Sequence, residues 1–80
     1  MARLVFGRLV STDDATVTYE YAIDRDDQWV GTLFIDRANP DVWWVDGPDR
    51  QPPSAAAIAF KARRRFEAVG EWPGRLSFQA

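Results

Sequence analysis

Acidic side chains would have to carry any catalysis by this 80-residue chain, because it contains no histidine and no cysteine. Histidine is the usual general base and cysteine the usual thiol nucleophile. The densest acidic group is Asp24, Asp26 and Asp27, in a segment that predicts a turn. Its spacing lacks the glycine and the distal glutamate of a calcium-binding EF-hand loop. We therefore expect no enzyme activity, no metal site and no cofactor, and interpret these aspartates as a charged hairpin tip that can contact a partner.

A basic segment, residues 61–66, could instead contact phosphate groups. It contains one lysine and three arginines, among them Arg63 and Arg64. Proteins that bind single-stranded nucleic acid combine a basic groove with aromatic side chains on which bases stack. The net charge of −2 and the pI of about 4.9 argue against this use, because nucleic-acid-binding domains are usually strongly basic. Single-stranded nucleic-acid binding by the basic helix and sheet aromatics is therefore the alternative function.

Aromatic residues form the third group, with four Trp, two Tyr and five Phe. Trp43 and Trp44 are neighbours in a segment that predicts a strand, so their side chains must point to opposite faces of a sheet. One helix on one face cannot cover both. Tryptophan, tyrosine and arginine often anchor protein interfaces. The candidate partner-binding residues are Trp29, Trp43, Trp44, Phe60, Arg63, Arg64, Asp24, Asp26 and Asp27.

Alternating apolar and polar residues predict strands joined by short polar turns. The expected strands span residues 2–10, 15–23, 28–36 and 41–46. Strands joined by such short turns form an antiparallel meander. In the third strand we expect Trp29 on the same face as Leu33 and Ile35. Gly31 within that strand predicts a bulge or a large neighbour over the backbone.

Residues 54–69 predict an amphipathic helix, which Gly70 would end in a left-handed conformation. The basic residues fall near its C-terminal end, where the helix dipole favours cations. Phe60 projects nearly opposite the apolar stripe, and residues 75–79 predict a short strand or an extended tail that could cover it. The apolar stripe is expected to comprise Ala55, Ile58, Ala59, Ala62, Phe66 and Val69.

Together these patterns predict one small α+β domain over residues 1–80. It is a four-stranded antiparallel β-meander followed by one amphipathic α-helix and a short C-terminal strand or extended tail. No segment resembles a signal peptide or a membrane helix, so we expect a cytoplasmic protein with no membrane partner.

The excess apolar surface of the sheet allows three arrangements. The sheet could curl on itself, the C-terminal segment could cover the second face, or that face could meet another chain. Exposed apolar patches usually mark interfaces. We therefore expect a small non-enzymatic protein-binding module that self-associates as a homodimer, of an accessory or inhibitor/immunity type. Its acidic hairpin tips would suit a basic protein partner.

Overall fold

The computed structural model describes residues 4–25, 28–47 and 51–79. The strands follow the order β4-β3-β2-β1-β5 across one sheet, and every neighbouring pair is antiparallel. The α+β fold predicted from the sequence, a four-stranded meander with one helix and a short C-terminal strand, is confirmed. The elements are β1 (Leu4–Thr12), β2 (Thr16–Ile23), β3 (Trp29–Asp36), β4 (Trp43–Val45), α1 (Pro53–Val69) and β5 (Arg75–Gln79).

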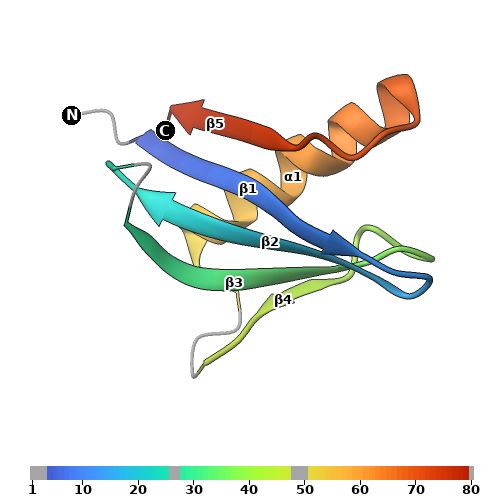
Figure 1. Cartoon of the computed structure of the whole chain (residues 1–80), viewed down its shortest axis with the longest axis horizontal. Helices are drawn as coiled ribbons and strands as arrows, with labels where there is room; N and C mark the ends of the chain where they lie inside the picture. The colour runs from blue at the N-terminus through green and yellow to red at the C-terminus, as the bar shows by residue number, and fades with distance from the viewer. Residues whose placement is uncertain (1–3, 26–27, 48–50, 80) are drawn as a thin grey trace.

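One face of the sheet is covered by α1, which crosses behind the strands in Figure 1. The core lies between this face and the helix, and its largest fully buried side chains include Tyr19, Leu33 and Ile58. Alternate residues of each strand point toward the helix, as the period of two along a strand requires. The buried core residues of the sheet are Val5, Val17, Tyr19, Tyr21, Leu33, Ile35 and Val45.

The helix begins at Pro53, where the missing N–H of proline costs nothing because no carbonyl precedes it in the helix. It ends at Val69, and Gly70 caps it in the predicted left-handed conformation with a φ of 78°. The Gly70 N–H donates to Phe66 O at 2.7 Å. The predicted apolar stripe is buried through Ala62, but Val69 is 52 % exposed. Phe66, in the last turn of α1, stacks on Trp72 in the loop between α1 and β5, with ring centroids 4.5 Å apart. No helix in the described ranges is long and apolar enough to cross a membrane.

Two glycines allow large side chains to lie directly on the backbone of the sheet. A Cβ atom on Gly7 would approach Ile58 Cγ2 to 2.8 Å, so the absence of a side chain lets α1 lie against β1. A Cβ atom on Gly31 would approach Cε1 of Tyr21 to 2.6 Å. The large neighbour predicted over Gly31 is therefore the ring of Tyr21.

The predicted position of Trp29 on the same face as Leu33 is wrong, because a bulge interrupts the pairing of β2 and β3. The register shifts between Tyr21 and Ala22, so that Tyr21 pairs with Gly31 whereas Ala22 pairs with Trp29. The extra residue interrupts the alternation of side chains along β3. Trp29 consequently lies on the face away from α1, whereas Leu33 lies in the core.

The C-terminal strand extends the sheet instead of covering its second face. β5 pairs with β1 from Leu4↔Gln79 to Arg8↔Arg75, and Leu9 N donates to Gly74 O at 2.8 Å. Leu76 packs against the core. Of the three arrangements considered above, coverage of the second face by the C-terminal segment is thus wrong, because its backbone groups pair at the edge of the sheet.

Tyr19 ties β2 to the loop before β5, because its hydroxyl donates to Pro73 O at 2.6 Å. Burial raises the pKa of this phenol well above its ordinary value, so the folded state keeps the proton that the unfolded chain loses near pH 10. Stability from Tyr19 is therefore present below that pH and is lost as the pH rises above it. We expect Tyr19→Phe to cost roughly 0.5–1.5 kcal/mol at neutral pH.

The deficit of Tyr19→Phe should shrink by up to about 1.4 kcal/mol per pH unit above pH 10, because phenylalanine does not ionise. Urea unfolding of both proteins between neutral pH and pH 11 measures the difference. A deficit that stays constant over this range would contradict the assignment.

Candidate functional site

The face of the sheet away from α1 has no cover within residues 4–25, 28–47 and 51–79. Figure 1 shows β3, β2, β1 and β5 in front of the helix with no described element before them. The register brings side chains from four strands onto this surface. We call it the open face and define it by Phe6, Arg8, Glu20, Trp29, Phe34 and Trp44.

An aromatic stack occupies the β3–β4 side of the open face. Phe34 and Trp44 are directly opposite each other in the ladder, and their rings lie 5.7 Å apart with an interplanar angle of 21°. Both side chains are half-buried. Stacked aromatic pairs present a broad, stiff apolar surface at little conformational cost, so this pair is suited to contact a flat partner.

An ion pair occupies the middle of the open face. Arg8 and Glu20 are cross-strand neighbours, and Arg8 Nε and Nη2 donate to Glu20 Oε1 at 3.1 and 2.8 Å. The Arg8 guanidinium also lies 4.3 Å from the centroid of the Trp29 ring. These contacts neutralise the two charges and hold Trp29 in place. They fix the central side chains before any partner arrives.

The β1–β5 side of the open face is a shallow hollow of mixed character, with Arg75 beside the aromatic rings. It has a volume of about 280 Å³ and is lined by Phe6, Trp29 and Ser77, among others. Ala22, which pairs with both Phe6 and Trp29, is fully buried although no described element covers it. The open face thus has aromatic surface on two sides of a neutralised centre.

The two adjacent tryptophans point to opposite sides of the sheet, as predicted. Trp43 pairs with Ile35 and packs against the core on the helix side, whereas Trp44 stacks on Phe34 on the open face. The open face therefore brings together only Trp29 and Trp44 of the candidate tryptophans, and Trp43 stabilises the core.

Of the acidic candidates, the structure describes Asp24, which lies in a hairpin turn. Asp24 has a positive φ of 66° and donates its N–H to Leu4 O at 2.7 Å, so its backbone forms the turn after β2. Asp26 and Asp27 lie outside the described residues.

Asp13, in the acidic turn between β1 and β2, has a structural role. Asp13 Oδ1 accepts the N–H groups of Ala15 and Thr16, and these hydrogen bonds hold the pKa of Asp13 below its ordinary value. The carboxylate therefore stabilises the turn between β1 and β2.

The basic candidates lie on α1, on the opposite side of the sheet from the open face. Arg63 pairs with Asp41, and its Nε lies 3.7 Å from Glu67 Oε1. Arg64 lies with its guanidinium carbon 5.7 Å from the centroid of the Phe60 ring. The helix continues to Val69, so its last turn holds no basic residue and the helix dipole does not account for these cations.

The sequence did not identify several of the residues that make up these surfaces. Phe6, Arg8, Glu20 and Phe34 join the open face only because the pairing of β1, β2 and β3 aligns them. The alternation of side chains along the strand indicated that Phe34 lies on the face opposite Leu33. Only the register of β3 and β4 shows that Phe34 is the partner of Trp44.

Comparison with protein-family models, with curated proteins and with solved structures finds no match for this chain. The function is therefore inferred from the chain's own residues. Within the described ranges, no three potential metal-ligating side chains come together. The open face brings together side chains from four strands.

Proposed function

We propose that this chain is a non-enzymatic protein-binding module that forms a homodimer through the open face of its sheet. The observation that carries the proposal is the Phe34–Trp44 stack on a face that no described element covers. Uncovered apolar surface of this kind usually marks an interface. Burying it against a second copy would remove the aromatic rings of both chains from water.

The charge of the open face supports a second copy as the occupant. A two-fold symmetric dimer brings a surface against its own copy, so a centre of one sign would repel itself. Here Arg8 and Glu20 cancel each other at the centre, and Arg75, which also lines the hollow, lies on the edge strand β5. The Cα atoms of the chain extend 35 by 29 Å across the two longer axes, so the chain is broad enough to hold a standard interface of roughly 800 Å² per partner.

The two edges of the sheet favour association through a face. On β5 the ammonium of Lys61 donates to Ser77 O, and on β4 Nε2 of Gln51 donates to Trp43 O at 3.0 Å. Each edge strand therefore has one carbonyl already bonded to a side chain, which reduces its capacity to pair with a strand of another chain.

The positions of the cations and aromatics support protein binding over the single-stranded nucleic-acid alternative. That alternative combines the basic helix with the aromatic residues of the sheet, which would have to lie on one surface. Arg63 and Arg64 lie on the helix side, whereas Trp44 and Trp29 lie on the open face.

Sedimentation equilibrium from about 1 to about 100 µM, where interfaces of this size commonly bind, tests the proposal. We expect a mass of two chains that persists at about 1 M salt, because the buried surface is apolar and its central charges are already paired. A head-to-tail contact between acidic turns and basic helices would instead dissociate in salt. A single-chain mass at every concentration, or dissociation by salt, would overturn the proposal.

A further inference from the structure

A second candidate interaction surface lies on the helix side, away from the open face. The outer surface of α1 and the neighbouring β5 form a groove of about 410 Å³. We call it the basic groove. It is lined by Phe60, Lys61, Arg64, Arg65 and Phe78.

Two phenylalanines supply apolar surface to the basic groove. Phe60 is 48 % exposed, which is high for a side chain of this size. Phe78 lies on β5 opposite Val5 and is half-buried. The C-terminal strand therefore brings a second ring to the same groove without burying Phe60.

The charged residues that the structure describes in the basic groove are all cations. Lys61, Arg64 and Arg65 line it, and its described lining contains no carboxylate. Arg63, by contrast, points to a different hollow and is neutralised by Asp41 and Glu67. Positive charge beside exposed apolar rings is concentrated here although the chain as a whole carries −2.

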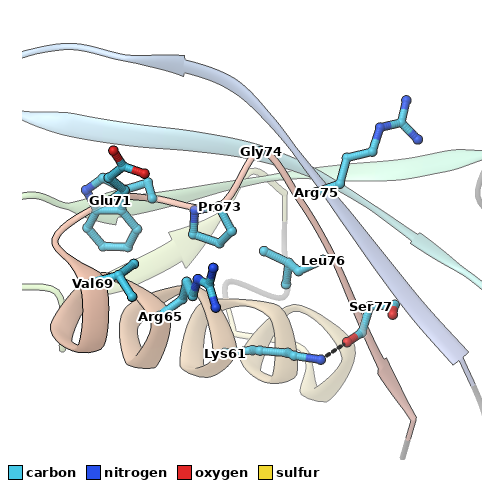
Figure 2. Close-up of a pocket in the computed structure, with 10 residues that line it drawn as sticks. Lys61, Arg65, Val69, Glu71, Pro73, Gly74, Arg75, Leu76 and Ser77 are labelled. Carbon is cyan, nitrogen blue, oxygen red and sulfur yellow. Dashed lines mark hydrogen bonds between the residues drawn. The ribbon is translucent and has the colours of Figure 1, made fainter.

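A larger groove of about 560 Å³ continues from the basic groove along the seam between α1 and β5. Figure 2 shows Lys61 and Arg65 extending from the helix toward the β5 segment, with Leu76 and Pro73 beyond them. Lys61 and Arg65 line both grooves. From Phe60 to Val69 the seam follows about 14 Å of helix, which is the length of about four residues of extended chain.

We propose that the basic groove binds a short acidic segment of another protein, with one apolar side chain between Phe60 and Phe78 and carboxylates against Arg64 and Arg65. Carboxylates form the strongest side-chain hydrogen bonds with guanidinium groups. This surface and the open face lie on opposite sides of the sheet, so the inference goes beyond the homodimer.

A peptide fits this surface better than a membrane or a nucleic acid does. An anionic bilayer or a long polyanion would also meet the acidic remainder of this chain, whose net charge is −2, whereas a short segment contacts only the groove.

The probe is a labelled synthetic peptide, Glu-Glu-Leu-Glu-Glu, added to the full chain and followed by fluorescence anisotropy and amide NMR shifts. Matched peptides replace glutamate by glutamine or leucine by alanine. Vesicles that contain phosphatidylserine and an oligothymidine are run in parallel. We expect binding of the acidic peptide that weakens with salt and with either replacement, and shifts confined to α1 and β5.

Two variants locate the site. Arg65→Gln should weaken peptide binding about three- to fivefold, which is the effect of removing one exposed charge pair. Phe60→Ala should weaken it about fivefold or more if this ring is the anchor. The control Arg37→Gln removes the same charge from the turn after β3, where the Arg37 side chain donates to Asp13 O and lines neither groove, and it should leave binding unchanged.

Absence of peptide binding at low salt, equal binding by Arg65→Gln, or binding of only the vesicles or only the oligothymidine would overturn the inference. The variant Trp44→Arg places a charge on the open face and should therefore be monomeric. It should bind the peptide as the wild type does. Failure of the homodimer and failure of the groove are therefore separate results.

Discussion

Replacing Trp44 by arginine is expected to convert the homodimer into a monomer while leaving the chain folded. Trp44 stacks on Phe34 on the uncovered face of the sheet, so the substitution places a charge where two copies would meet. Loss of a central tryptophan anchor commonly costs 2 kcal/mol or more, which corresponds to at least about a 30-fold weaker dimer. The fold loses an aromatic contact worth roughly 0.5–1.5 kcal/mol in addition to the apolar area that the half-buried Trp44 ring covers. Sedimentation equilibrium measures the first effect, and thermal unfolding measures the second.

The matched control for this experiment is Phe60→Arg. It introduces the same side chain in place of an aromatic residue, but Phe60 lies on the outer surface of α1 and is 48 % exposed. We expect this variant to remain dimeric. If Phe60→Arg dissociates the dimer and Trp44→Arg does not, the chains associate through the helix and the proposal is wrong.

Substituting alanine for Gly7 is expected to destabilise the fold by roughly 1–3 kcal/mol, the usual cost of overpacking a filled core. The added Cβ atom would approach Ile58 Cγ2 to 2.8 Å, and Ile58 is fully buried at the contact between α1 and β1. A chain of this size has only about 4–12 kcal/mol of stability. The loss should therefore be plain in urea unfolding.

A double-mutant cycle with Ile58→Ala tests the cause. Removing the Ile58 branch leaves space for the new methyl group, so the double variant should cost less than the two single variants together, by about 0.5–3 kcal/mol. Gly74→Ala is the control, because a Cβ atom added there would have no neighbour within 4 Å, and it should change stability by no more than about 0.5 kcal/mol. Simple additivity of Gly7→Ala and Ile58→Ala would contradict this packing.

Local patterns in the sequence were sufficient to predict the elements of the fold. The alternation of Val17, Tyr19 and Tyr21 with polar residues identified β2, and Gly70 identified the end of α1. Both features depend only on neighbours along the chain. The opposed orientation of Trp43 and Trp44 was also predictable, because adjacent residues in a strand point to opposite faces.

Features that depend on pairing between strands were not predictable in the same way. The bulge opposite Ala22 shifts Trp29 to the open face, and the sequence indicated a bulge or a close neighbour near Gly31 without showing its effect on Trp29. The place of β5 beside β1 joins residues more than 60 positions apart. The sequence left it open whether this segment would pair at an edge or cover a face.

The candidate residues show the same division. Phe60, Arg64 and Trp44 were identified by residue type and by their position within an element. Phe78 became a candidate only when β5 brought it next to the helix, where it forms the basic groove with Arg65. A surface assembled from separate elements is therefore less predictable than the elements themselves.

The most direct test of the homodimer is isotope-filtered NOE spectroscopy on a mixture of labelled and unlabelled chains, which detects only contacts between copies. We predict intermolecular NOEs from the rings of Trp44, Phe34 and Trp29. Intermolecular NOEs confined to α1 or to the edge strand β5 would contradict the proposed interface, and so would their absence from every sample.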